Sequence, residues 1–255
     1  MKRMVIKVGS NVLTRGDGCF DTTRVSALVD QIVSLRRLGY EIILVSSGAV
    51  ACGRSATVAA DGLDEVQRRQ LFASVGQVIL MNHYYGLFAD YGIKVGQVLT
   101  MKKNFETPEE YENQRSCMEG MLCSGLIPIV NENDTVSITE LMFTDNDELS
   151  GLVAAMMGAQ TLFILSNVDG IYDGDPADAA SSVIRRVGPD DSVDGFVSEH
   201  KSEFGRGGML SKCHIARQAA RSGIRVVIAN GKRDNILLDV LERPDTTVHT
   251  EFIAA

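Results

Sequence analysis

Short apolar runs alternate along this chain with longer segments whose apolar residues recur every three or four positions. The runs are typical of buried parallel strands, and the longer segments are typical of helices that bury one face. The runs predict strands over 4–8, 41–46, 95–99, 127–130, 161–165 and 225–229. The periodic segments predict helices over 21–39, 64–90, 107–125, 149–156 and 209–223. Because strand and helix alternate with short joints, we expect βαβ units and an α/β fold with a mostly parallel sheet.

Local signals refine some of these elements. The sequence Thr107-Pro108-Glu109-Glu110 offers an N-cap, a proline at the first helical position and a glutamate that can close a capping box. The segment 64–90 is long for one helix, so we expect two helices that meet near Gly76 or Asn82. The small, weakly patterned residues of 53–63 predict a mobile loop.

Polar turns follow the ends of five predicted strands. In an open parallel sheet the carboxyl ends of the strands lie at one edge, and ligands bind in the crevice outside them. Each turn taken singly is ordinary, because Gly, Ser, Asn and Asp are common turn and cap residues. Together they predict a polar crevice. The turns are Gly9-Ser10, Ser46-Ser47-Gly48, Asn131 to Asp134, Ser166-Asn167 and Asn230-Gly231.

Two lysines make this crevice a candidate phosphate site. Lys7 lies near the end of the first strand, where it either contacts a phosphate or extends its ammonium to water from the sheet edge. The glycine-rich segment 205–208 precedes a helix that carries Lys212, and a helix N-terminus favours phosphate. The spacing matches neither a P-loop nor a dinucleotide fingerprint, so an ordinary loop remains an alternative.

The acidic segment Asp145-Asn146-Asp147 stands at a predicted helix start. Acidic residues there can simply cap the helix and oppose its dipole. Alternatively, the carboxylates hold the lysines and metal-bound phosphates in register, while Asn146 and Asp134 bind polar groups of a small substrate. The sequence offers no Ser/His/Asp arrangement, metal-ligand spacing or paired glycosidase carboxylates as a rival set.

Composition narrows the class of protein. With 255 residues and 45% hydrophobic content, the chain can bury a sizeable core as one α/β domain over 1–255. Its net charge of −8 disfavours broad electrostatic binding of nucleic acid or an acidic membrane. The five cysteines lack a C-x-x-C pair, which favours free thiols in a reducing compartment. With no signal-peptide pattern and no membrane-spanning apolar run, we expect a soluble, cytoplasmic protein.

Five motifs together resemble the glutamate 5-kinases, a branch of the amino acid kinase family, and the resemblance covers nearly the whole chain. The N-E-N-D and D-N-D motifs discriminate best, because the other motifs occur in several branches of the family. The resemblance implies a three-layer αβα sandwich around a mostly parallel sheet. The motifs are Val5 to Ser10, Ser46 to Val50, Val130 to Asp134, Asp145 to Ser150 and Gly207 to Lys212.

The resemblance also implies an activity and its cofactors. The γ-phosphoryl group of ATP would be transferred to the γ-carboxylate of L-glutamate, which is the first step of proline biosynthesis. The N-terminal half would bind glutamate and the C-terminal half would bind ATP. Phosphoryl transfer to glutamate suits the lysines and the helix N-terminus described above. A carboxylate is already a nucleophile, so the reaction needs only alignment of the two substrates and neutralisation of their charge. Mg²⁺ would be carried by ATP, with no protein side chain assigned to it.

The resemblance implies roles for the residues of this chain that match the motifs of the family. Lys7 and Lys212 would contact the transferring phosphoryl group, and Asp147 would orient them. Relatives often have Thr-Asp where this chain has Ser166-Asn167, so the role of Asn167 stays open. The glutamate site would comprise Ser47, Gly48, Asn131, Asp134, Asp145 and Asn146. The ATP site would comprise Lys7, Gly9, Ser166, Asn167, Arg206, Gly207, Gly208, Met209, Leu210, Ser211 and Lys212.

The resemblance suggests partners and leaves two alternatives. It implies proline as a feedback inhibitor, a homodimer or homotetramer, and transfer of the product to glutamate-5-semialdehyde dehydrogenase. Many relatives carry a C-terminal RNA-binding domain of the PUA type, which we expect to be lacking here. One alternative is a sister kinase that acts on acetylglutamate, aspartate, carbamate or UMP. The other is a sensor that binds a nucleotide or amino acid without catalysis.

Overall fold

The sheet is the centre of the molecule. The computed structural model describes residues 2–137, 143, 145–176, 178, 180–189, 191 and 208–255. Eight strands pair in the order β3-β4-β2-β1-β5-β7-β8-β6, and the pairs from β3 to β7 are all parallel. The central strands are β1 (Lys2–Val8), β2 (Tyr40–Ser46), β3 (Val95–Thr100), β4 (Ile127–Glu132), β5 (Thr161–Ser166) and β7 (Arg225–Asn230). The expected mostly parallel α/β fold is therefore confirmed.

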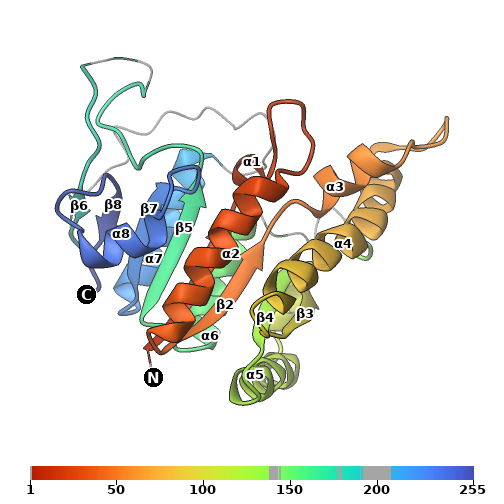
Figure 1. Ribbon diagram of the computed structural model, residues 1–255, viewed down its shortest axis with the longest axis horizontal. Helices are drawn as coiled ribbons and strands as arrows, with labels where there is room; N and C mark the ends of the chain where they lie inside the picture. Colours follow the sequence, from red (N-terminus) through yellow and green to blue (C-terminus); the bar gives the residue numbers. More distant parts are fainter. Residues whose placement is uncertain are drawn as a thin grey trace.

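Helices cover both faces of this sheet. On one face lie α2 (Thr22–Arg37), α4 (Glu65–Ala89) and α8 (Ile236–Glu242), which bury one large apolar cluster. A second cluster is buried on the other face by α5 (Pro108–Cys123), α6 (Asn146–Met156) and α7 (Met209–Arg221). Figure 1 shows α2 and α8 in front of the sheet and α7 behind it. The three-layer αβα sandwich is confirmed.

Some of the predicted helix starts are confirmed and one predicted capping box is wrong. Asp21 caps α2 as expected, since its carboxylate accepts the N–H of Arg24. Pro108 is the first residue of α5, but the side chain of Thr107 makes no capping hydrogen bond. The predicted capping box is wrong because Glu110 instead accepts a hydrogen bond from the amide of Asn104 at 2.8 Å.

The region from 49 to 90 differs most from expectation. The predicted loop over 53–63 is wrong in its first part, because α3 (Ala49–Ala56) occupies it. The predicted break in 64–90 is also wrong, because α4 is one helix of 25 residues. A Cβ atom on Gly76 would lie 1.7 Å from the carbonyl oxygen of Ala49 in α3. Gly76 therefore lets two helix backbones touch and does not end a helix.

Several short helices and strands between the long elements were not predicted from the sequence. The helix α1 (Ser10–Leu13) follows β1 where a loop was expected, and the 3₁₀ helix η1 (Lys102–Phe105) follows β3. The strands β6 (Arg186–Val187) and β8 (Thr250–Phe252) extend the sheet beyond β7, with β8 antiparallel to it. Within the described residues, no helix combines the length and apolar character needed to cross a membrane.

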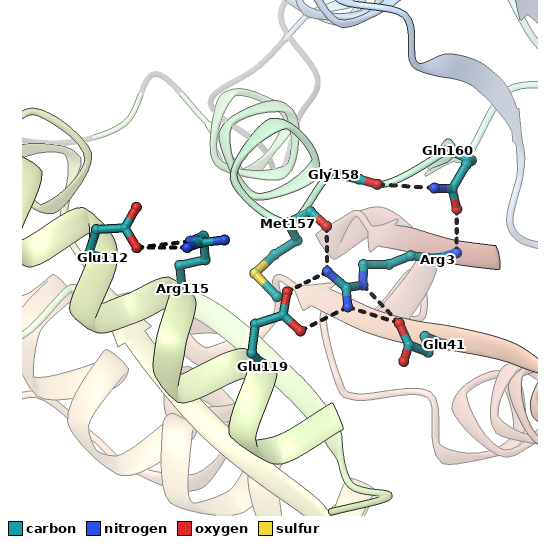
Figure 2. A network of polar contacts seen from close by, with 8 residues as sticks. All are labelled: Arg3, Glu41, Glu112, Arg115, Glu119, Met157, Gly158 and Gln160. Atoms are coloured by element: carbon teal, nitrogen blue, oxygen red, sulfur yellow. Dashed lines mark hydrogen bonds and ion pairs between the residues drawn. The ribbon is translucent and has the colours of Figure 1, made fainter. Parts of the chain in front are cut away.

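A polar cluster joins four elements at the amino ends of the strands. The guanidinium group of Arg3 on β1 pairs with Glu41 on β2 at 2.9 Å. It also bonds both carboxylate oxygens of Glu119 on α5, at 2.7 and 2.9 Å, and the carbonyl oxygen of Met157 after α6, at 2.6 Å. Figure 2 shows these contacts converging on the one guanidinium group. This edge of the sheet is thus closed by charge-assisted hydrogen bonds.

Candidate active site

A cavity of about 1010 Å³ lies where the central strands end. Its walls are the turns after β1, β2, β4 and β5, together with the N-terminal ends of α6 and α7. The carboxyl ends of parallel strands meet at this edge, which is why segments distant in sequence share one cavity. Of the predicted site residues, it brings together Lys7, Gly9, Ser47, Gly48, Asn131, Asp134, Asp145, Asn146, Asp147, Ser166, Asn167, Gly208, Met209 and Lys212.

Two lysines share one buried carboxylate at the centre of this cavity. The Lys7 ammonium lies 2.5 Å from Oδ1 of Asp147, and the Lys212 ammonium lies 3.0 Å from Oδ2. All three side chains are buried. Burial alone would raise the pKa of Asp147, but the two ammonium groups lower it to about 2. Asp147 therefore stays ionised and fixes both lysines at one point.

Asp145 builds the helix start that places Asp147. Its Oδ1 accepts the backbone N–H groups of Asp147 and Glu148, so it is the N-cap of α6. Its Oδ2 accepts the hydroxyl of Ser211 on α7 at 2.9 Å. Burial is the main cause that raises the pKa of Asp145. One carboxylate thus links the helix that carries Asp147 to the helix that carries Lys212.

Amide and hydroxyl groups form a second cluster beside the lysines. The amide nitrogen of Asn146 donates to the hydroxyl of Ser47 at 2.8 Å and to the side-chain oxygen of Asn131 at 3.0 Å. Asn131 donates in turn to Gln77 on α4 at 3.0 Å. Gly48 has φ of +102°, a backbone conformation that favours glycine, and it turns the chain from β2 into α3. These groups can hydrogen-bond a small polar ligand.

An acidic pair with an arginine follows β4. Arg69 on α4 donates to Oδ1 of Asp134 from two of its nitrogens, at 3.1 and 2.5 Å. The same guanidinium lies 3.9 Å from Glu132, whose other carboxylate oxygen accepts the N–H of Phe143 at 3.0 Å. Burial, with the nearby charge of Asp134, raises the pKa of Glu132 to about 7. Burial also raises the pKa of Asp134.

Only some of the residues predicted to bind the nucleotide are placed to contact a ligand in the cavity. The N–H of Gly9 donates to the carbonyl of Leu165 at 3.2 Å, so this donor supports the fold and does not face an anion. Leu210 and Ser211 belong to α7 but do not line the cavity. Arg206 and Gly207 lie outside the described residues.

Sequence reasoning missed Arg69 and Glu132, which both line the cavity. Glu132 lies inside the N-E-N-D motif, so its position among the polar residues after β4 was the available signal. Arg69 lies near the start of a helical segment, next to another arginine, and nothing local separates the two. Its role depends on the packing of α4 against the turn after β4.

Two buried ammonium groups beside an open cavity can neutralise anionic groups that approach each other, which is what phosphoryl transfer requires. Both oxygens of Asp147 are engaged by these lysines. Within the described part of the chain, no group of three His, Cys, Asp or Glu residues could hold a metal ion. The two ammonium groups thus suit an anionic ligand.

Known proteins with similar sequences share nearly the whole length of the chain. The model of the amino acid kinase family matches residues 2–230. A glutamate 5-kinase from Bacteroides thetaiotaomicron is 61% identical over 251 residues, which cover 98% of this chain and 70% of that relative. A glutamate 5-kinase from Symbiobacterium thermophilum is 44% identical over 241 residues, which cover 94% of this chain and 92% of that relative.

Solved structures share the fold at low sequence identity. Carbamate kinase from Giardia lamblia bound to AMP-PNP superposes with a TM-score of 0.71 at 12% identity, over 99% of this chain and 98% of that one. An isopentenyl phosphate kinase in a substrate complex gives a TM-score of 0.68 at 15% identity, over 99% and 100% of the two chains. Because the family model spans most of the sequence and the relatives match nearly all of it, this chain belongs to the amino acid kinase family.

Proposed function

We propose that this protein transfers the γ-phosphoryl group of ATP to the γ-carboxylate of L-glutamate, the first step of proline biosynthesis. The names of the relatives support the acceptor, since several are glutamate 5-kinases. The observation that carries the proposal is the buried Lys7–Asp147–Lys212 cluster, which lines the same cavity as the polar groups around Asn146. One cavity can thus hold a phosphate and a polar acceptor together.

Charge neutralisation is the main task of this site. The γ-carboxylate of glutamate attacks the γ-phosphorus, the bond to the β–γ bridging oxygen breaks, and ADP leaves. Glutamate's carboxylate is ionised at neutral pH and needs no general base. Lys7 and Lys212 reduce the repulsion between the two anions and stabilise charge on the transferring group. Asp147 holds both ammonium groups in place, so little reorganisation is needed during the step.

The two substrates would occupy different halves of the cavity. Ser47, Asn131, Asp134 and Asn146 would bind glutamate. Ser166, Asn167 and the start of α7 would face ATP. The N-terminal half of the chain would thus bind glutamate and the C-terminal half would bind ATP. Asp145, whose oxygens are engaged by α6 and Ser211, would position the site and not bind the substrate directly.

Mg²⁺ would enter with the nucleotide. Because Asp147 is committed to two lysines, the phosphate oxygens of ATP are the natural ligands of the ion, as in other kinases. The ion would add neutralising charge at the phosphates. We also propose a cytoplasmic homodimer or homotetramer that proline inhibits and that passes its acyl phosphate product to glutamate-5-semialdehyde dehydrogenase.

An acceptor panel tests the reaction. Purified protein with Mg²⁺ and ATP would be given L-glutamate, acetylglutamate, aspartate, carbamate or UMP, with ADP release as the readout. Hydroxylamine would trap an acyl phosphate as its hydroxamate. We expect rapid ADP release and hydroxamate formation with L-glutamate. A preference for another acceptor would replace the proposed substrate, and binding of ATP and glutamate without ADP release would indicate a sensor.

Lys212 provides the sharpest test of the mechanism. We expect Lys212→Ala to lower kcat by on the order of 10²-fold or more, the usual loss when one preorganised charge stabiliser is removed. The KM for glutamate should change far less. Arg221→Ala, an exposed substitution at the other end of α7, is the matched control and should leave kcat unchanged. Near-normal turnover by Lys212→Ala would remove Lys212 from the mechanism.

A further inference from the structure

We propose that Arg69 binds the α-carboxylate of the amino-acid acceptor, so that Arg69 and Asp134 together select substrates with a zwitterionic head. This inference rests on the proposed function, because it concerns the acceptor of that reaction. It assigns a specificity role to a residue of α4 that the motifs of the family do not include.

The position of Arg69 fits this role. The residue lines the cavity, and 31% of its side chain remains exposed. Nε and Nη2 both donate to the same oxygen of Asp134. A guanidinium group has five N–H donors in a planar fork, so these contacts leave donors that can bind a carboxylate.

The charges of the pair match those of an amino acid. An α-amino acid presents an ammonium and a carboxylate on one carbon atom. Asp134, supported by the neighbouring Glu132, offers negative charge to the ammonium, and Arg69 offers a fork to the carboxylate. A zwitterion can therefore replace part of the existing Arg69–Asp134 contact with two contacts of the same kind.

The sheet sets a suitable distance between the head and the reacting end. Asp134 follows β4, Lys7 is the last residue but one of β1, and β2 lies between these two strands. Adjacent strands are about 4.8 Å apart, so β1 and β4 lie roughly 10 Å from each other across β2. Glutamate in an extended conformation can span such a gap when its head lies at Arg69 and its γ-carboxylate lies near the lysines.

Rigid elements hold Arg69 in place. Gln70, the next residue of α4, donates to the carbonyl of Thr135 at 2.9 Å and so fixes the helix to the turn that carries Asp134. Close backbone contact with α3 at Gly76 holds the same helix. The neighbouring Arg68 behaves differently, because it is exposed, lies outside the cavity and bonds the carbonyl of Leu63. Arg68 is thus a natural control.

Two glutamate analogues separate the contacts. Glutarate keeps both carboxylates but lacks the ammonium, and 4-aminobutanoate keeps the ammonium but lacks the α-carboxylate. We would measure the KM for L-glutamate and the inhibition constants of both analogues against it. Arg69→Met should raise the KM for glutamate and the inhibition constant of glutarate by about 10- to 100-fold, the usual loss of a charged hydrogen-bonded contact. The inhibition constant of 4-aminobutanoate should change by less than about threefold.

Matched variants complete the test. Asp134→Asn should show the reverse pattern, with weaker binding of glutamate and 4-aminobutanoate and little change for glutarate. Arg68→Met should leave all three constants unchanged. Arg69→Gln, which keeps polarity and most of the volume, would replace Arg69→Met if the methionine variant failed to fold, and the same pattern is expected of it.

The outcomes distinguish the two proposals. If Arg69→Met weakens the binding of glutamate, glutarate and 4-aminobutanoate equally, Arg69 only holds the turn after β4 and the inference is wrong. Unchanged constants would also overturn it. If the wild-type protein forms no hydroxamate from glutamate, the proposed function fails whatever the variants do.

Discussion

We expect Glu132 to make binding of the acceptor sensitive to pH. Among the described residues, the groups facing its carboxyl group include the carboxylate of Asp134, the guanidinium of Arg69 and the N–H of Phe143. Burial and the charge of Asp134 raise the pKa of Glu132 to about 7. Below that pH the group is neutral, so it attracts the ammonium of an amino acid less. Above that pH the ionised form adds to the attraction.

We therefore expect the KM for glutamate to rise several-fold as the pH falls from 8 to 6, by at most about tenfold per pH unit. In Glu132→Gln this dependence should disappear. Because the folded-state pKa is raised, ionisation of Glu132 costs stability as the pH rises from about 4.5 through 7. The Gln variant should therefore be at least as stable as wild type at pH 8, and an unchanged pH profile would assign the titration to another group.

At this scale the sequence reveals residues that lie at strand ends. Lys7, Asp147 and Lys212 could be proposed together because each lies at a strand end or a helix start on one edge of a parallel sheet. Arg69 could not, because no local pattern distinguishes it from the neighbouring Arg68 on the same helix. Its pairing depends on tertiary packing, which neither hydrophobic period nor turn chemistry encodes.

Among the elements, α3 and α4 show how glycine can be misread. Gly53 and Gly76 lie where the two helices cross, and a Cβ atom on Gly53 would lie 1.8 Å from the carbonyl oxygen of Phe72. Gly76→Ala would push the helix backbones apart. We expect the free energy of unfolding to fall by about 1–3 kcal/mol or more, as in other overpacked interiors. Chemical denaturation with the linear extrapolation measures this change.

Gly86 is the control on the same helix. A Cβ atom there would have no neighbour within 4 Å, so only helix propensity should act. Gly86→Ala should therefore stabilise the protein by about 0.5–1 kcal/mol. If both variants changed stability by the same amount and sign, the close approach of α3 and α4 at Gly76 would be contradicted.

Periodicity predicted the long elements because burial on one or both faces leaves a clear pattern over many residues. It failed where that pattern was short or ambiguous. The two and three residues of β6 and β8 are too few to show a period. Gly76 and Gly53 resembled a helix break and a loop, because local sequence does not distinguish a glycine that ends a helix from one that admits a neighbour. The capping box failed because Asn104, from the preceding turn, engaged Glu110.

Across the whole molecule, the two edges of the sheet have different tasks. The carboxyl ends of the strands carry the cavity, where paired charges are left accessible to ligands. The amino ends carry the Arg3 cluster, which ties β1 and β2 to α5 and α6 (Figure 2). Because parallel strands run the full depth of the sheet, the two edges are separated by the buried core. Stability and catalysis should therefore respond separately to changes at the two edges.

Arg3→Met tests this separation. The substitution removes hydrogen bonds to two carboxylates and one carbonyl, and the Arg3 side chain is only 16% exposed. We expect the free energy of unfolding to fall by about 1–3 kcal/mol, the scale of a charged hydrogen-bonded contact reduced by the partial exposure of Glu119. The kcat and both KM values should stay close to wild type at temperatures well below the melting point.

Arg115→Met is the matched control, because Arg115 pairs with Glu112 on the same helix as Glu119 (Figure 2). Both partners of that pair are about half exposed, so the pair should contribute less than about 0.5 kcal/mol. Denaturant titrations of the two variants, run beside the kinetic assay, give the comparison. If the Arg3→Met variant lost kcat while it was still fully folded, changes at the amino ends of the strands would be transmitted to the cavity. Equal stability losses in both variants would mean that the Arg3 cluster contributes no more than an ordinary surface pair.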